Sequence, residues 1–277
     1  HGQANHTAAY NHVICLFLRT HCHIKRDMSA KIKLENISVW GVDTHARAAG
    51  LKQWFLRKGS ARSTRIPILQ DIHFEANPGD RVALLGMNGS GKSSLLKVVS
   101  GNYPIHQGVR EVKGLVAPLI EMGAGFDPEV SGRKNIKLTY AFRGKLRDYN
   151  TQIEQTIIEF SELEEKIDLP LKTYSSGMRA RLAFASAIFQ EPDILLIDEI
   201  FATGDAGFIE KSMRILRAKV EQVSIALMVN HELNELLSLC NRAVVVHHGR
   251  IVAAGGMQDM AEYYTHQILH LQEGQAA

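Results

Sequence analysis

The amino-acid sequence predicts an α/β fold, in which helices cover a mainly parallel β-sheet and a helical subdomain is inserted in the middle of the chain. Two observations support this prediction. Short apolar runs alternate along the chain with segments of helical periodicity, as they do in strands joined by crossover helices. Between about residues 125 and 190, most of the chain has helical spacing, which predicts a subdomain that lies outside the sheet.

Composition is that of an ordinary globular protein. A chain of 277 residues is long enough to bury a core and to hold one domain. The net charge of +3 is too small to indicate nucleic-acid binding by itself. No stretch reaches the roughly 18 apolar residues of a membrane span, so membrane association would need a partner or a surface. Cys15, Cys22 and Cys240 predict no disulfide framework, and we expect a reducing cytosol.

The first 27 residues differ from the rest and are excluded from the fold prediction. They contain five histidines, and His21-Cys22-His23 places possible metal ligands closer together than any standard zinc spacing. Metal binding therefore stays open, but a leader or tag before Met28 is the favoured interpretation. We expect residues 28–272 to form a single domain, followed by a short tail, residues 273–277.

Two strand-like runs flank an insertion near the N-terminus. Lys31–Trp40 alternates apolar and polar residues, and Ile68–Ala76 is a second strand-like run. Within the insertion, residues 41–65, Trp54 and Phe55 lie on the apolar face of a predicted short amphipathic helix with basic neighbours. This face could pack in the core or contact a membrane partner, and the sequence leaves both interpretations open.

The remaining predicted elements follow in alternation. Strands are predicted at residues 81–85, 108–112, 115–120, 194–197, 224–229, 243–246 and 250–254. Helices are predicted at residues 93–100, 176–189 and 260–272, and the pattern is helical from residue 131 to about residue 160. No element is predicted between the strand at 194–197 and the strand at 224–229.

A glycine-rich segment follows the strand predicted at 81–85. Gly86–Ser93 has the P-loop spacing Gly-x4-Gly-Lys-Ser, which is typical of proteins that bind nucleoside triphosphates. Glycines let backbone N–H groups close around phosphate oxygens, and the following helix points its positive end at them. Lys92 is expected to reach the β- and γ-phosphates, and the Ser93 hydroxyl to bind Mg²⁺. The predicted ATP-binding residues are Gly86, Met87, Asn88, Gly89, Ser90, Gly91, Lys92, Ser93 and Ser94.

Two carboxylates end a later apolar run. Ile194–Ile197 is followed directly by Asp198 and Glu199. An ATPase with a P-loop needs an acidic side chain at a strand end to hold Mg²⁺ through water, which suits Asp198. Glu199 suits a general base that activates the attacking water. Carboxylates commonly end strands, so this pair indicates ATP hydrolysis only in combination with the P-loop.

Two further features allow both a functional and a structural interpretation. A turn of small residues, Tyr174–Met178, stands just before the helix predicted at 176–189. It could hold a phosphate at the helix N-terminus, or Ser175 or Ser176 could simply cap the helix. His231 follows the strand predicted at 224–229, where an imidazole could reach a γ-phosphate or serve only the structure.

Together these features resemble the ATP-binding subunits of ABC transporters. Gly86–Ser93 resembles Walker A, Tyr174–Met178 a variant of the Leu-Ser-Gly-Gly-Gln signature, and Ile194–Glu199 Walker B, in the order of that family. Ala202–Asp205 resembles the D-loop, with Asp205 as its acidic residue, and His231 resembles the switch histidine. The resemblance implies a P-loop NTPase (RecA-like) fold with an N-terminal antiparallel β portion.

The same resemblance implies a homodimer arranged head to tail, with two ATP molecules enclosed between the subunits. In the family, the P-loop of one subunit and the signature of the other bind one nucleotide, so Ser175 and Gly177 should contact the γ-phosphate in trans. The implied catalytic residues are Glu199 and His231. The implied residues that act in trans are Ser175, Ser176, Gly177 and Met178.

A narrower resemblance points to one branch of the family. Leu119–Ile136 and Tyr174–Ala185 are similar to segments of the exporters of bacterial surface polysaccharide, which include O-antigen, capsule and teichoic acid. Glu121 stands near the Gln of importers and drug exporters, and Ser176 and Met178 replace Gly and Gln of the signature. The family's adenine-stacking aromatic corresponds to a position near Gly41. The adjacent Trp40 could stack on adenine or pack in the core.

We therefore expect the ATP-binding and ATP-hydrolysing subunit of an ABC transporter that exports a surface polysaccharide, with ATP as substrate and Mg²⁺ as cofactor. Its expected partners are a second copy of itself and an integral-membrane permease, at the cytoplasmic face of the bacterial inner membrane and without nucleic acid. One alternative is an ABC ATPase for another cargo, such as an importer or a lipid exporter. The other is an ABC ATPase acting on nucleic acid or the ribosome.

Overall fold

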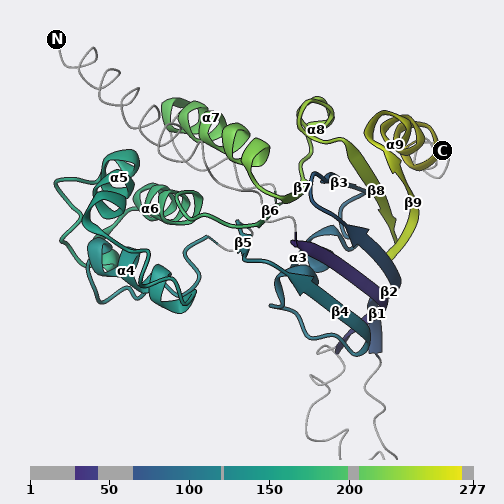
Figure 1. Cartoon of the computed structure of the whole chain (residues 1–277), viewed down its shortest axis with the longest axis horizontal. Helices are drawn as coiled ribbons and strands as arrows, with labels where there is room; N and C mark the ends of the chain where they lie inside the picture. Colours follow the sequence, from purple (N-terminus) through teal and green to yellow (C-terminus); the bar gives the residue numbers. More distant parts are fainter. Residues whose placement is uncertain (1–28, 43–64, 120–121, 199–205, 270–277) are drawn as a thin grey trace, which may run out of the picture. The chain divides into compact units, whose positions relative to one another are not determined.

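The computed structural model describes residues 29–42, 65–119, 122–198 and 206–269 (Figure 1). These residues form two compact units. We call Gly114–Ala226 the helical unit, and Ser29–Lys113 together with the chain from Leu227 onward the sheet unit. Trp54 and Phe55 lie outside the described residues. No described helix has the length and apolarity of a membrane span.

The sheet unit contains an antiparallel sheet of three strands in the order β2-β1-β4. The strands are β1 (Lys31–Val42), β2 (Arg65–Ala76) and β4 (Gln107–Lys113). The predicted alternation places Ile32 and Leu34 in the core. This sheet is the expected N-terminal antiparallel portion. β1 and β2 both extend beyond the predicted strands into the insertion, and register shifts between Leu34 and Trp40 interrupt their pairing.

A second group of strands in this unit contains the predicted hairpin. β3 (Arg81–Leu85) pairs in parallel with β8 (Arg242–His247), and β8 pairs antiparallel with β9 (Arg250–Gly256). Residues 82–85 of β3 are fully buried, as a short apolar strand covered on both faces should be. The helices of this unit are α3 (Lys92–Ser100), α8 (Leu233–Leu239) and α9 (Met257–Tyr263), which continues as a π-helix, η4 (Tyr264–Leu269).

The described residues of the helical unit form a parallel strand pair and four α-helices. β5 (Val116–Pro118) pairs with β6 (Ile194–Asp198), and β5 is shorter than predicted. The helices are α4 (Gly132–Phe142), α5 (Thr151–Ser161), α6 (Ser176–Ile188) and α7 (Ala206–Gln222), with a 3₁₀ turn η2 (Leu171–Thr173) before α6. β7 (Ile225–Val229) crosses the boundary between the two units.

The helical pattern predicted at residues 131–160 contains two helices, α4 and α5. Gly144 has a φ of 68°, a left-handed conformation that ends the helical path after α4. Asn150 then caps α5, since its side chain accepts a hydrogen bond from the Ile153 backbone N–H at 2.9 Å. The predicted helical pattern is therefore confirmed, and the break within it lies where Gly144 and Asn150 interrupt the two helices.

Helix α7 was not predicted, and it completes the core of the helical unit. Its buried residues recur at helical spacing, which is the signal that could have revealed it; they are Phe208, Ser212, Ile215, Leu216, Lys219 and Val220. Phe208 packs against Phe160 and Phe184 at ring centroid distances of 5.6 and 6.1 Å. These contacts are edge-on, the geometry that aromatic pairs prefer.

Candidate functional site

The glycine-rich loop between β3 and α3 has a backbone that only glycine can follow freely. Gly86, Gly89 and Gly91 have φ angles of 153°, 77° and 111°. At Gly86, an added Cβ would lie 2.3 Å from the Val246 carbonyl oxygen, which is a severe clash. The loop therefore adopts the close backbone approach that the P-loop spacing predicts, with Asn88 and Gly89 exposed at its tip.

Lys92 points back into this loop. Its Nζ donates hydrogen bonds to the carbonyl oxygens of Gly86 at 2.7 Å and Met87 at 2.9 Å. The side chain is buried, so a fixed positive charge lies among backbone groups. Ser93 follows it on the exposed side of the helix. Among the described residues no side chain caps α3, and its first turn has no acidic residue, so this helix N-terminus suits an anion.

Ser90 and Gly86 test whether this loop fits a phosphate. The Ser90 hydroxyl is buried and has no hydrogen-bond partner within the described part of the chain. Such a buried polar atom is costly unless a ligand or water satisfies it. An added Cβ at Gly86 would also lie 2.6 Å from this hydroxyl. The loop thus combines an unsatisfied hydroxyl, a buried lysine and a helix N-terminus without a described side-chain cap, a donor set that suits phosphate oxygens.

The turn between β8 and β9 is hydrogen-bonded to the glycine-rich loop. The Gly249 N–H donates to the Ser90 carbonyl oxygen at 2.8 Å, and the Gly249 carbonyl accepts from the Gln70 N–H at 2.8 Å. Gly249 is buried with a φ of 74°, and an added Cβ would lie 2.4 Å from the Ile68 carbonyl oxygen. Backbone bonds therefore join the loop to β2 through this turn. Sequence reasoning missed this support.

Trp40 lies on β1 and is half-buried, so it is not a core residue. Its ring contacts His106 edge-on at a centroid distance of 5.3 Å, and the Arg65 guanidinium carbon lies 5.7 Å from its centroid. Trp40 pairs with Pro67 on β2. The next residue, Ile68, has its carbonyl oxygen 3.4 Å from the position of a Cβ on Gly91. Trp40 therefore pairs with the residue of β2 that directly precedes the one approaching the glycine-rich loop.

The predicted carboxylate site is described only in part. Asp198 ends β6 in the helical unit and is half-buried, after four residues that are fully buried. This is the strand end that the sequence predicted. Glu121, Glu199 and Asp205 lie outside the described residues.

The signature segment forms the N-terminus of α6. Ser175 is the N-cap, and its hydroxyl accepts a hydrogen bond from the Met178 backbone N–H at 3.2 Å. Ser176 is the first helical residue, so of the two candidate caps the structure selects Ser175. Both serines are exposed, and within the described residues an added Cβ on Gly177 would meet only the Ser175 hydroxyl, at 3.9 Å. The turn is therefore open as well as capped.

His231 lies in the sheet unit, just after β7, and is exposed. The neighbouring Asn230 organises the chain there. Its side-chain oxygen accepts from the Glu232 N–H at 3.0 Å, and its side-chain nitrogen donates to Glu235 at 2.8 Å. This turn opens α8 and presents His231 at the end of a buried strand, as the sequence predicted.

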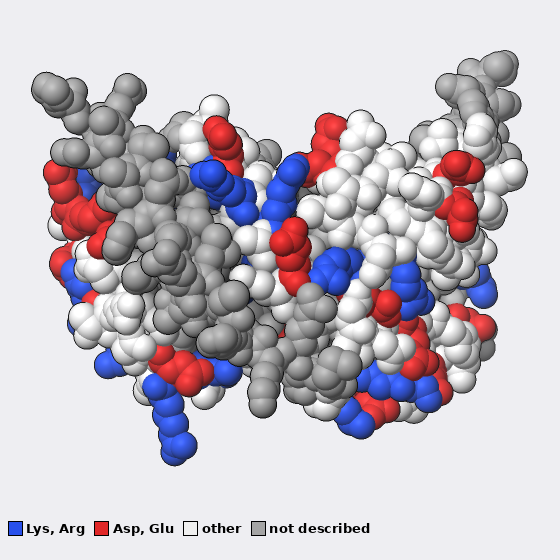
Figure 2. Space-filling view, turned by 45° about the horizontal axis from the view of Figure 1, so that its top comes forward, with Lys and Arg blue, Asp and Glu red and all other residues white. Residues whose placement is uncertain are grey.

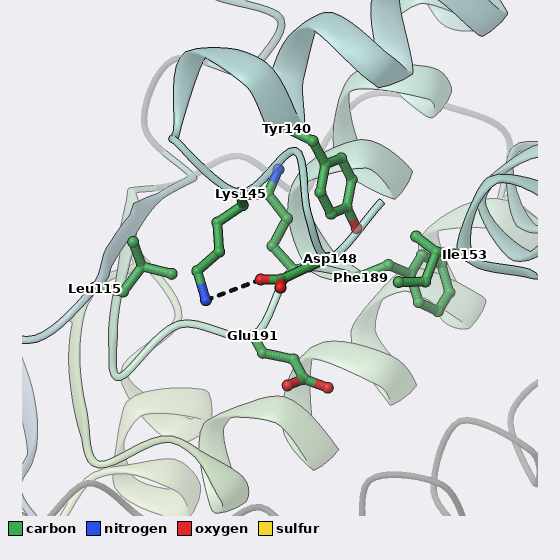
Figure 3. A pocket seen from close by; sticks show the side chains of 8 residues that line it. Leu115, Tyr140, Lys145, Asp148, Ile153, Phe189 and Glu191 are labelled. Atoms are coloured by element: carbon green, nitrogen blue, oxygen red, sulfur yellow. Dashed lines mark ion pairs between the residues drawn. The ribbon is translucent and has the colours of Figure 1, made fainter. Parts of the chain in front are cut away.

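The helical unit also contains a cavity of about 250 Å³ (Figure 3). Its lining comes mostly from the end of α4, the turn after it and the segment after α6: Leu115, Tyr140, Lys145, Asp148, Ile153, Phe189, Gln190 and Glu191. Lys145 and Asp148 form an ion pair at 3.2 Å across it. The Tyr140 hydroxyl is buried without a hydrogen-bond partner in the described chain. Burial raises the pKa of Tyr140, which therefore remains a hydrogen-bond donor.

Comparison with known proteins agrees with these features. A family model described as ABC transporter matches residues 69–202. The O-antigen export system ATP-binding protein RfbE of Yersinia enterocolitica is 41% identical over 70% of this chain and 82% of that protein. The teichoic acids export ATP-binding protein TagH of Enterococcus faecalis is 37% identical, over 75% of this chain and 47% of that protein.

Solved structures support the fold. An ATP-binding cassette, solved as a dimer in a post-hydrolysis state with ADP and Pi, superposes with a TM-score of 0.62. Its sequence is 18% identical, and the match covers 82% of this chain and 98% of that chain. The predicted P-loop α/β fold is therefore confirmed. With this fold and relatives such as RfbE matched over most of their length, the chain belongs to the ABC transporter family of ATP-binding proteins.

Proposed function

We propose that the chain is the ATP-binding and ATP-hydrolysing subunit of an ABC transporter that exports a surface polysaccharide of the O-antigen, capsule or teichoic-acid type. The observation that carries this proposal is the similarity to RfbE over 82% of that protein, which is named as part of an O-antigen export system. TagH, named for teichoic acid export, belongs to the same group of relatives. Residues 28–272 act in this proposal as one nucleotide-binding cassette.

ATP would bind with its phosphates in the glycine-rich loop. Backbone N–H groups and Lys92 hold the β- and γ-phosphates, and Trp40 stacks on adenine. Ser93 and Asp198 would hold Mg²⁺, which neutralises phosphate charge during hydrolysis. Glu199 accepts a proton from the attacking water, and His231 donates a hydrogen bond to the γ-phosphate. The unsatisfied Ser90 hydroxyl supports phosphate binding in this loop.

A second copy of the chain would complete each site. The open turn at Ser175, Ser176 and Gly177 suits contact with the γ-phosphate of an ATP held by the other subunit. The Met178 backbone N–H donates to the Ser175 hydroxyl at 3.2 Å, which fixes the position of that oxygen and leaves its proton available to the phosphate. Glu121 and Asp205 would act as the Q-loop-like and D-loop residues of the cassette.

The membrane partner would be a permease, with this subunit at the cytoplasmic face of the inner membrane. Phe142 and Leu146, on either side of the turn after α4, are 70% and 47% exposed. Lys145, which lies between them in the sequence, and Tyr140, which precedes them, both line the cavity described above. Two large, exposed apolar side chains only four residues apart favour contact with another protein over solvent.

Export itself is tested in the cell. We expect an allele with Lys92→Ala to remove polysaccharide from the cell surface while polymer accumulates inside. A Lys97→Ala allele, which changes the same residue type on the same helix, should preserve export. Normal surface polymer in the Lys92→Ala strain would overturn the export assignment and favour another cargo.

On the face shown in Figure 2, basic and acidic side chains of the described residues are interspersed, which gives no support to the nucleic-acid alternative.

Phe142 and Leu146 give a separate prediction for the permease contact. Replacing both with Ser should lower recovery of the permease on co-purification about tenfold or more, because burial of each side chain contributes about 1.5–3 kcal/mol. ATP turnover of the isolated subunit should not change. Leu237→Ser is the matched control, since Leu237 is also exposed but lies on α8. Unchanged co-purification would exclude this surface as the contact.

Trp40 gives a prediction for the adenine contact. The chain has two tryptophans, so in a Trp54→Phe background selectively excited tryptophan fluorescence reports on Trp40 alone. We expect ADP to change its fluorescence. Trp40→Ala should weaken ADP binding about tenfold, since a base stacked on an aromatic ring contributes about 1–3 kcal/mol, and Trp40→Tyr should preserve it. An unchanged emission at saturating ADP would show that Trp40 does not contact the base.

A further inference from the structure

A buried asparagine organises the turn before α4. Asn135 is 0% exposed. Its side-chain nitrogen donates to the carbonyl oxygens of Asp127 at 2.9 Å and Ser131 at 3.1 Å, and its side-chain oxygen accepts from the Asp127 N–H at 2.7 Å. One side chain therefore ties both ends of the Asp127–Ser131 turn. Each of these buried groups would be costly without its partner, so the turn is rigidly defined.

This turn is bonded to the segment that leads into the signature. The Leu171 N–H donates to the Val130 carbonyl at 3.0 Å, and the Lys172 N–H to the Pro128 carbonyl at 2.9 Å. The Lys172 ammonium also pairs with Glu129 at 2.7 Å. These bonds connect two stretches about 40 residues apart, and they end three residues before Ser175.

Tyr174, directly before Ser175, is fitted against the start of α4. Its hydroxyl donates to the Lys166 carbonyl at 2.7 Å, and its side chain is buried. An added Cβ on Gly132 would lie 2.4 Å from this hydroxyl and 3.1 Å from the Ile167 carbonyl oxygen. Gly132 does not have a positive φ, so an alanine there would be acceptable to the backbone. Only the contact with Tyr174 and Ile167 requires glycine.

We infer that Asn135 and Gly132 are positioning residues for the signature, and through it for the trans half of the ATP site. Ser175 is held on one side by α6, whose N-cap it is, and on the other by Tyr174. Tyr174 in turn rests on Gly132, and the chain before it on the turn that Asn135 organises. This inference rests on the proposed function, because the signature acts in trans only if two copies form the composite site.

Gly132→Ala is the test, because a single methyl group should displace Tyr174. The isolated variant should bind ATP with unchanged affinity, since the P-loop is not altered. Turnover should fall about 100-fold, the cost of a displacement of about 1 Å at a reacting site. The double variant Gly132→Ala, Tyr174→Phe removes the clashing hydroxyl and should recover part of the turnover. Wild-type turnover in Gly132→Ala would overturn the inference.

Mixing variants separates a positioning role from a general loss of structure. In a heterodimer of Gly132→Ala with Lys92→Ala, one site combines the intact P-loop of the first subunit with the intact signature of the second. We therefore expect this mixture to recover turnover that neither variant has alone. A mixture of Gly132→Ala with Gly177→Asp should not recover, because both signatures are then impaired.

The control mixture is Lys92→Ala with Gly177→Asp. If it recovers turnover and the mixture of Gly132→Ala with Lys92→Ala does not, the positioning role is wrong and the composite site stands. If the control mixture does not recover, the composite site fails, and the inference fails with it. If Gly132→Ala does not fold, Asn135→Asp replaces it in the same mixtures, because this change keeps the side-chain volume and removes the N–H donors to the turn. The mixture of Asn135→Asp with Lys92→Ala must then recover ATP turnover for the inference to stand.

Discussion

Lys92→Ala is expected to weaken ATP binding about 100-fold, since the variant loses charge-assisted hydrogen bonds to phosphate worth about 1.5–3 kcal/mol each. Lys92 is buried within the glycine-rich loop and donates to the carbonyl oxygens of Gly86 and Met87. Its ammonium is therefore already confined beside the backbone that would surround the phosphates. A confined charge loses little conformational entropy on binding, which makes its removal costly.

Calorimetric titration with ATP measures this effect directly. Lys97→Ala is the matched control, because Lys97 belongs to the last turn of α3 while Lys92 begins the helix. The control should bind ATP as the wild type does. Thermal unfolding of both variants distinguishes lost affinity from lost structure. ATP affinity in Lys92→Ala equal to that of the wild type would contradict the assignment of the loop to phosphate binding.

Glu199→Gln should lower ATP turnover by about 10²- to 10⁴-fold, the usual contribution of a general base. The amide has nearly the same shape but cannot accept the proton of the attacking water. ATP should still bind, because the P-loop is unchanged. Since closed dimers would then form without being reopened by hydrolysis, we expect a nucleotide-bound dimer to accumulate.

Turnover assays and size-exclusion chromatography with Mg²⁺ and ATP test both parts of this prediction. Glu164→Gln, an exposed position in the helical unit, is the control for the change of Glu to Gln. It should hydrolyse ATP normally and form no stable dimer. Hydrolysis at the wild-type rate in Glu199→Gln would refute the catalytic role, whatever the state of association.

Local sequence patterns predicted most of the fold and the central loop of the site. The P-loop could be predicted because its residues are neighbours in the chain, and its backbone demands glycine at fixed positions such as Gly86. The alternation along β1 predicted its buried face for the same reason. It did not predict the register shifts between Leu34 and Trp40, since these depend on which residues of β2 and β4 come opposite.

The parts that escaped prediction depend on distant contacts or on weak patterns. α7 has the helical recurrence of buried residues, but Ser212 and Lys219 occupy buried positions and obscure the apolar stripe. The turn at Gly249 supports the P-loop through bonds to Ser90 and Gln70 that no local pattern indicates. Likewise, the tie between Asn135 and the signature segment requires two stretches to meet that are far apart in the sequence.

The support of the glycine-rich loop by the β8–β9 turn has a consequence for biosynthesis. The Gln70 side-chain amide also donates a hydrogen bond to the His248 carbonyl oxygen in this turn, and the two residues are 178 positions apart in the chain. A contact of such long range forms late and slowly, because the intervening chain must first be made and closed into a loop. While the ribosome is still adding that chain, the glycine-rich loop is already synthesised but lacks its hydrogen bonds to the β8–β9 turn. We therefore expect the nascent protein to acquire nucleotide affinity only once its last hairpin has emerged and paired.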